Sequence, residues 1–269
     1  MHIKIEKQLQ ALVTELLSAE PSALAVMLFG SYSRGDEGPF SDIDVRVFTA
    51  APPVQRDRVR IVGSDGRPVH WSIGSRTVAE KLTEIADPEQ WPWAAAHYQQ
   101  MRTLHDPLDI LTLMRAAVER ARPGPAAYAA TIGHDLETLL EYLAKVNNAA
   151  LVGSTPDAVQ AAVKVVHYCE RLLRPLNPVQ PFDNEPAVDV YYRELPVAPP
   201  NWPADRDFCL GITGLPRTVM DVLFAAQSMA LGTAGLLSDH VDELPFPVDV
   251  AAALRDGRIH AYLMRNEQQ

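Results

Sequence analysis

Apolar side chains recur with helical and strand periods through the first part of the chain. Between residues 4 and 19 they lie three or four positions apart, which predicts an amphipathic helix. The apolar run at 23–29 predicts a strand, and a second strand is expected at 42–48. Two further strands at 58–63 and 67–73 flank Ser64-Asp65-Gly66, a turn typical of a β-hairpin. Three helices are expected to follow, at about 77–86, 88–101 and 107–120.

Helical periodicity dominates the rest of the sequence. Arg122-Pro-Gly-Pro125 is the best candidate for a domain boundary, so we predict domains at 1–124 and 125–269. The proline-rich segment 175–203 is expected to be largely extended or looped. The fold class is therefore α+β, with an N-terminal mixed-sheet domain and a C-terminal helical bundle. The bundle's helices are predicted at 126–150, 155–173, 215–237 and, as a short one, within 247–264.

Composition narrows the setting and the partners. The 269 residues have a formal net charge of -10, whereas a general nucleic-acid binder shows a basic stripe. Only Cys169 and Cys209 are present, without metal-type spacing, which favours a reducing, cytoplasmic location. No apolar run approaches the ~18 residues of a membrane span, and the N-terminus lacks a signal-peptide core. We expect neither nucleic acid nor membrane as a partner.

The candidate chemistry lies between Gly30 and Asp44. Gly30-Ser31 follows an apolar strand, where a sharp turn presents N–H groups and a hydroxyl to an anion. Asp42 and Asp44 open the next strand, and the period of two places them on one face. Two carboxylates there suit a hard divalent cation shared with a triphosphate. The alternative is a turn followed by an edge strand with exposed aspartates.

These motifs resemble those of the polymerase-β-type nucleotidyltransferases, and most closely the kanamycin (aminoglycoside 4′-O-) nucleotidyltransferases. The resemblance extends from about Leu24 to Thr155 and weakens beyond it. The segments that carry it are Gly30-Ser31-x-x-Arg34, Gly38-Pro39-Phe40-Ser41-Asp42-Ile43, Trp91-Pro92 with His97 and His105-Asp106, and Leu139-Leu140-Glu141-Tyr142-x-x-Lys145.

The resemblance implies roles for individual residues. Ser31 and Arg34 would bind the β- and γ-phosphates of ATP, next to Gly30. Asp42 and Asp44 would hold Mg²⁺. Glu141 would act as the general base on the acceptor hydroxyl. Lys145, one turn further on, would pair with the phosphates and keep that carboxylate ionised; without the resemblance, the two form an ordinary surface ion pair.

One position departs from the family pattern. Superfamily members place a third carboxylate on a later strand, where this chain has His70. An imidazole is a poor ligand for Mg²⁺. Three alternatives stay open: two aspartates suffice, another metal such as Mn²⁺ is tolerated, or activity has been lost.

The sequence therefore predicts an enzyme that moves AMP from ATP to a hydroxyl of a small molecule. The resemblance implies a cationic acceptor such as an aminoglycoside, hence antibiotic resistance, and a homodimer. The alternatives are a silent nucleotide-binding or regulatory protein, and a biosynthetic enzyme with another acceptor. An antitoxin-like enzyme acting on protein hydroxyls is disfavoured by length. Asp135, Glu137 and Glu170 are interpreted as solvated helix faces, the alternative being an acidic acceptor pocket.

Overall fold

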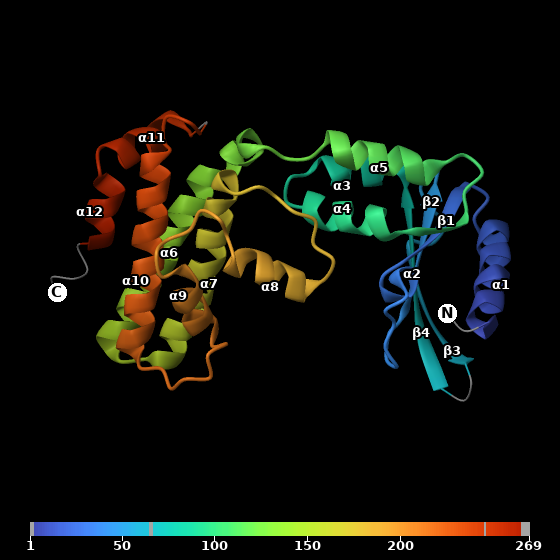
Figure 1. Cartoon of the computed structure of the whole chain (residues 1–269), viewed down its shortest axis with the longest axis horizontal. Coiled ribbons are helices and arrows are strands. Elements are labelled where there is room, and N and C mark those ends of the chain that lie inside the picture. The colour runs from blue at the N-terminus through green and yellow to red at the C-terminus, as the bar shows by residue number, and fades with distance from the viewer. Residues whose placement is uncertain (1–2, 65–66, 245, 265–269) are drawn as a thin grey trace. The chain divides into compact units, whose positions relative to one another are not determined.

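The computed structural model describes residues 3–64, 67–244 and 246–264, and its chain contacts divide into two compact units (Figure 1). The first unit comprises Met1–Arg122 with Pro181–Asp183, and the second comprises Pro123–Gln180 with Asn184–Gln269. The main division lies within the Arg122-Pro-Gly-Pro125 segment, between Arg122 and Pro123.

A mixed five-stranded sheet forms the centre of the first unit, in the order β3-β4-β2-β1-β5 among the described residues. Strands β2 and β4 run parallel, and the other neighbours are antiparallel. The strands are β1 (Ala23–Phe29), β2 (Ile43–Thr49), β3 (Asp57–Ser64), β4 (Arg67–Thr77) and β5 (Arg102–His105). The helices are α1 (Ile3–Ala19), α2 (Ser31–Arg34), α3 (Val78–Ala86), α4 (Trp91–Gln100) and α5 (Ile110–Arg120).

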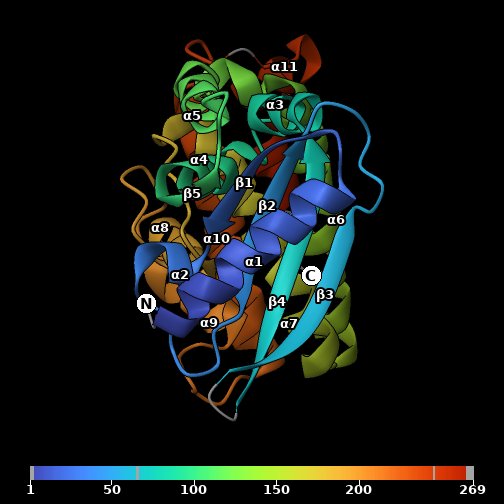
Figure 2. The ribbon, with the colours of Figure 1, turned by 90° about the vertical axis from the view of Figure 1, so that its right-hand side faces the viewer.

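The two faces of the sheet have different surroundings. Figure 2 shows α1 lying across β1, β2, β4 and β3, and its apolar stripe packs on that face. Leu9 and Leu16 of α1 are buried there together with Val45 of β2. On the opposite face, the Phe48 ring lies 6.2 Å from the ring of Tyr98 on α4. Because strand side chains alternate, Asp44 lies on the face opposite α1.

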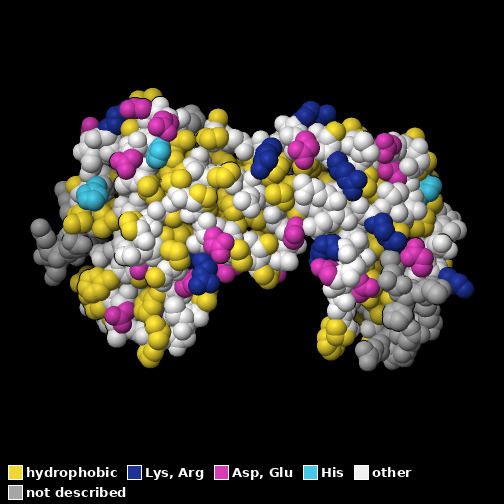
Figure 3. Space-filling model, in the orientation of Figure 1, with side chains coloured by type: hydrophobic (Ala, Val, Ile, Leu, Met, Phe, Trp, Pro, Cys, Tyr) yellow, Lys and Arg dark blue, Asp and Glu magenta, His cyan; other side chains and the backbone are white. Residues whose placement is uncertain are grey.

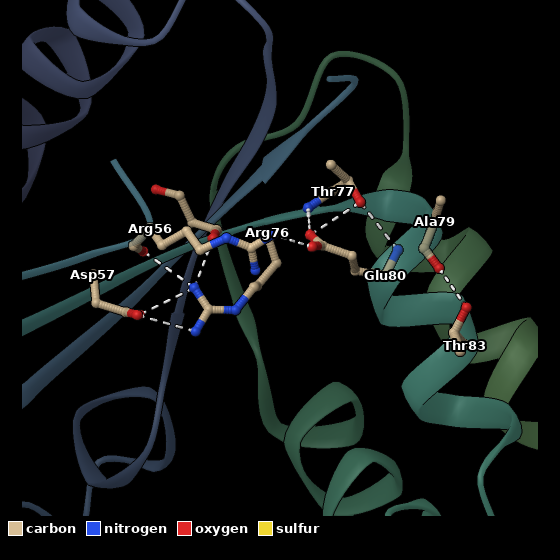
Figure 4. A network of polar contacts seen from close by, with 8 residues as sticks. Arg56, Asp57, Arg76, Thr77, Ala79, Glu80 and Thr83 are labelled. Carbon is tan, nitrogen blue, oxygen red and sulfur yellow. Dashed lines mark hydrogen bonds and ion pairs between the residues drawn. The ribbon is translucent and has the colours of Figure 1, made fainter. Parts of the chain in front are cut away.

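A polar network joins the sheet to α3 (Figure 4). Thr77 ends β4 and caps α3: its hydroxyl accepts from the Glu80 N–H at 3.0 Å, and the Glu80 carboxylate accepts from the Thr77 N–H at 2.8 Å. The Thr77 N–H and the Arg56 guanidinium, which donates at 2.5 Å, lower the pKa of Glu80 to about 2. This network fixes where the sheet ends and the helix begins.

Thr77→Ala is expected to destabilise the protein by about 1 kcal/mol, because the first turn of α3 loses its cap. Urea unfolding measures the change. Thr83 is the matched control, since its hydroxyl only donates to the Ala79 carbonyl within α3 and Ala favours a helix. Equal losses for Thr77→Ala and Thr83→Ala would contradict the capping role.

The second unit is helical. Its longest helices are α6 (Ala129–Val152), α7 (Thr155–Leu173) and α10 (Val219–Asp239), and α10 contacts α6, α7 and α9. By length and composition alone, α10 is the one helix in the described residues that could cross a membrane, but half of its tested window is buried inside this unit. Its smaller elements are the 3₁₀ turns Pro125–Tyr128 and Arg174–Leu176, and helices α8 (Glu185–Arg193), α9 (Trp202–Leu210), α11 (Val248–Arg255) and α12 (Arg258–Met264).

The α+β fold class is confirmed, while two interpretations of the second unit are wrong. The proline-rich segment is not simply extended, because α8 begins inside it, with Asn184 accepting from the Ala187 N–H at 2.9 Å. Asp135 and Glu170 do not lie on solvated faces. Asp135 is 3% exposed and pairs with Arg171 at 2.9 Å, and Glu170 is 9% exposed and pairs with Arg206 at 2.8 Å.

Candidate active site

A tight turn follows β1. Gly30 has φ 70° and ψ -159°, a conformation that residues with a side chain essentially do not adopt. The four-residue helix α2 comes next and ends at Gly35, which is left-handed with φ 81°. The Ser33 hydroxyl donates to the Gly30 carbonyl at 2.7 Å and holds the turn. Gly30 and Ser31 therefore lie in a short turn that directly follows the end of β1 and is held by a hydrogen bond.

The turn lies directly against the aspartate strand. Phe29 of β1 and Asp44 of β2 are register partners, so Gly30 and Asp44 are neighbours across the two strands. A Cβ atom built on Gly30 would lie 2.6 Å from Asp44 Oδ2. The glycine is therefore needed twice, for its backbone conformation and for the close approach of the carboxylate.

The two aspartates influence one another. Burial, followed by the charge of Asp42, raises the pKa of Asp44 to about 6. Arg46 and His70 oppose that rise. The predicted strand 42–48 included Asp42, which is wrong, because β2 begins at Ile43. The Asp42 side chain is 47% exposed.

Arg34 is held near the same turn by polar contacts. Its Nε lies 3.0 Å from Asp36 Oδ2, and its Nη1 donates to Gln100 Oε1 at 3.0 Å. Gln100 in turn donates to Asp183 at 2.5 Å. These contacts fix the guanidinium beside α2 without a phosphate present.

His70 lies beside the aspartate pair. It is on β4, and its Nδ1 is 3.6 Å from Asp42 Oδ2. Its neighbour Ser72 is the register partner of Asp44. In the part of the chain that the structure describes, no group of three or more His, Cys, Asp or Glu side chains is arranged to hold a metal ion.

The donors nevertheless fit a hard divalent cation. Asp42 and Asp44 supply carboxylate oxygens, which Mg²⁺ prefers, and Mg²⁺ keeps several water or phosphate ligands of its own. The raised pKa of Asp44 shows that its negative charge is poorly compensated by the protein alone. A bound cation would supply that compensation.

Arg46 belongs to this region and is missed by motif reasoning. It follows Asp44 by two positions, so it shares the face of β2 that carries the aspartate. Its guanidinium carbon lies 5.2 Å from the Phe29 ring centre, and it lowers the pKa of Asp44. The sequence feature that could have indicated Arg46 is the strand period of two, which places Asp42, Asp44 and Arg46 on the same face.

Glu141 and Lys145 lie on α6 of the second unit. Lys145 Nζ is 2.7 Å from Glu141 Oε1 and 4.2 Å from the centre of the Tyr142 ring. The hydrogen bond with Glu141 raises the pKa of Lys145. Both side chains are well exposed. The structure brings these two together, as it brings Gly30 against Asp44, with Asp42 beside Asp44, in the first unit.

The second unit has one cavity that includes Lys145 and a larger one that includes neither Glu141 nor Lys145. A cavity of about 400 Å³ is lined by Tyr142, Lys145, Lys164 and Asp157 among others, so it offers two cations, a carboxylate and an aromatic ring. A larger cavity of about 770 Å³ lies along α9 and α10 and contains none of the predicted residues. On the visible face of each unit, Lys and Arg side chains lie among acidic and neutral ones (Figure 3).

The comparisons with known proteins agree with the geometry of the first unit. Residues 9–86 match the family model of the nucleotidyltransferase domain. That segment runs from α1 through α3 and includes Gly30, Ser31, Arg34, Asp42 and Asp44. The match supports the polymerase-β-type superfamily and nucleotidyl transfer in general. The kanamycin branch stays a hypothesis.

The whole chain also resembles a solved structure. A nucleotidyltransferase-like protein from Exiguobacterium sibiricum 255-15 superposes with a TM-score of 0.51 at 15% identity. The likeness covers 97% of this chain and 80% of the other. At this identity it shows a shared fold only. No curated protein sequence matches the chain.

Proposed function

We propose that the protein transfers AMP from ATP to a hydroxyl of a small molecule. The observation that carries the proposal is the contact between Gly30 and Asp44, which joins a phosphate-type turn to a carboxylate pair within the matched domain. A nucleoside triphosphate needs both features at once, donors for its phosphates and oxygen ligands for the metal that accompanies it.

The nucleotide end of the site is assigned to three residues. Ser31 and Arg34 bind the β- and γ-phosphates, the hydroxyl as a single donor and the guanidinium as a fork. The contacts of Arg34 with Asp36 and Gln100 orient it before the nucleotide arrives. Gly30 keeps the turn open to the phosphates, because no side chain projects there.

Asp42 and Asp44 would hold Mg²⁺, which when bound neutralises the phosphate charge during displacement. Asp44 binds in its ionised form, so binding is weakened when that carboxyl takes up a proton. Arg46 keeps part of the charge of Asp44 compensated from within the sheet.

The general base is assigned to the helical unit. Glu141 takes the proton of the acceptor hydroxyl, and Lys145 pairs with the phosphates. The resemblance makes an aminoglycoside the first acceptor to test, and it implies a homodimer, while the cysteine content favours the cytoplasm. Antibiotic resistance would be the biological consequence.

Pyrophosphate release tests the proposal. We expect release that requires ATP, Mg²⁺ or Mn²⁺, and a hydroxyl acceptor, with aminoglycosides as the first panel. GTP, CTP and UTP in place of ATP measure the preference for the base. Absence of release with every nucleotide, metal and acceptor, despite ATP binding, would contradict transfer.

A silent nucleotide-binding protein is the second candidate. The observation that favours it is the imidazole of His70 at the place of the third carboxylate, beside Asp42. ATP binding detected by calorimetry, without turnover, would support this candidate. His70→Glu would then be expected to restore metal binding, because it returns a third oxygen ligand.

A further inference from the structure

The sheet face that carries Asp44 ends in an exposed apolar surface. Across the strands, Asp44 of β2 pairs with Ser72 of β4, and Ser72 pairs with Val59 of β3. In the adjacent row, His70 pairs with Ile61. Val59 is 68% exposed and Ile61 is 75% exposed. We call Val59 and Ile61 the β3 shelf. Paired residues project from the same face, so the shelf lies on the side of the aspartates.

The direction of the reaction gives the shelf a role, and this step rests on the proposed function. The attacking and leaving oxygens of a phosphoryl transfer lie roughly in line, on opposite sides of the phosphorus. The turn proposed to hold the departing pyrophosphate follows β1, on one side of Asp44. The acceptor must then arrive from the other side of β2, which is occupied by β4 and β3.

The chemistry on that side does not suit a polycation. The two rows of paired residues are Asp44–Ser72–Val59 and His70–Ile61. Their one acidic side chain is Asp44, which is already assigned to the metal. The others are a hydroxyl, an imidazole and the two apolar side chains of the β3 shelf. Asp57, further along β3, is paired with Arg76 at 3.0 Å. An approaching aminoglycoside would find no uncommitted carboxylate in these rows of the described structure.

We propose that the acceptor carries its hydroxyl on an apolar group, and that Val59 and Ile61 bind this group beside Ser72 and His70. The acceptor class is thus an alkyl or aromatic alcohol, rather than an aminoglycoside. Transfer forms the bond between the acceptor oxygen and the α-phosphorus, breaks the bond to pyrophosphate, and passes the hydroxyl proton to a general base.

Methyl NMR of the full-length protein tests the assignment with two probes, 3-phenyl-1-propanol and kanamycin. With Mg²⁺ and α,β-methylene-ATP present, we expect the phenylpropanol to shift the Val59 and Ile61 methyl signals saturably, and kanamycin to leave them unchanged. Val59→Ser with Ile61→Ser is expected to weaken phenylpropanol binding at least fivefold. Val54→Ser is the matched control, since Val54 is 78% exposed and lies outside both rows.

Each contrary result has its own meaning. Shifts caused by kanamycin, or phenylpropanol binding that survives the double substitution, would overturn the shelf assignment alone. Light scattering that shows a dimer lost on Val59→Ser with Ile61→Ser would assign the shelf to a second copy and also overturn it. If α,β-methylene-ATP fails to shift the amides of residues 30–34, the proposed function falls, and the inference with it.

Discussion

Asp44→Asn is expected to abolish pyrophosphate release, by at least about 10³-fold, and at the same time to stabilise the protein at pH 8. The loss follows because an amide cannot replace a charged metal ligand. The gain follows because the folded protein holds the Asp44 carboxyl with a raised pKa of about 6, so ionising it at pH 8 costs free energy. Asn removes that cost.

The sign of the pH dependence is fixed by the direction of the shift. Between about pH 4 and pH 6 the folded state binds more protons at Asp44 than the unfolded state does, so stability falls as pH rises through this window. One pKa unit corresponds to about 1.4 kcal/mol, and partial exposure reduces the effect, so we expect a gain of about 1 kcal/mol at pH 8. At pH 4 the gain should vanish.

Urea unfolding at pH 4 and pH 8, without metal, measures the stability, and Asp42→Asn is the companion variant. It should also abolish release, and it should stabilise less, because burial is the larger cause of the raised pKa of Asp44. For the native protein, Mg²⁺ should raise the melting temperature more at pH 8 than at pH 5. Full turnover in Asp44→Asn would remove the metal site from the proposal.

The sequence predicted the parts of the fold that have a clear period. The apolar run 23–29 is β1 with the same bounds, since seven successive residues of that kind leave little choice of structure. The motif from Gly30 to Asp44 predicted a turn and an aspartate pair, and register then brought Gly30 and Asp44 into contact. Motif spacing predicted the members of the candidate site, while the contact between Gly30 and Asp44 came from strand pairing.

Short elements and distant partners were not predictable in this way. Strand β5 has four residues, and α2 also has four, which is too short for a period to show. Helices α8 and α9 were not predicted, because their prolines were interpreted as helix-breaking residues. These prolines lie in the first turn of each helix, where proline is tolerated. Glu170 is buried because Arg206, far along the chain, pairs with it. No local pattern predicts that partner.

Gly30→Ala is expected to lower the rate of transfer by about 10²-fold or more and to destabilise the fold by about 1–3 kcal/mol. The backbone at φ 70° and ψ -159° is strained for alanine, which accounts for the stability loss. The new Cβ would lie 2.6 Å from Asp44 Oδ2, so the carboxylate must move. A displacement of about 1 Å in a site of this kind costs about 10²-fold in rate.

Gly35→Ala separates the two effects. Gly35 also has a positive φ, 81°, but a Cβ there meets nothing within 4 Å. The Gly35→Ala variant should therefore lose stability through backbone strain while keeping most of its activity, because the added Cβ displaces no neighbouring side chain. Pyrophosphate release and urea unfolding on both variants give the comparison. If Gly35→Ala loses as much activity as Gly30→Ala, strain in the turn explains the loss, and the contact between Gly30 and Asp44 has no separate part in positioning the carboxylate.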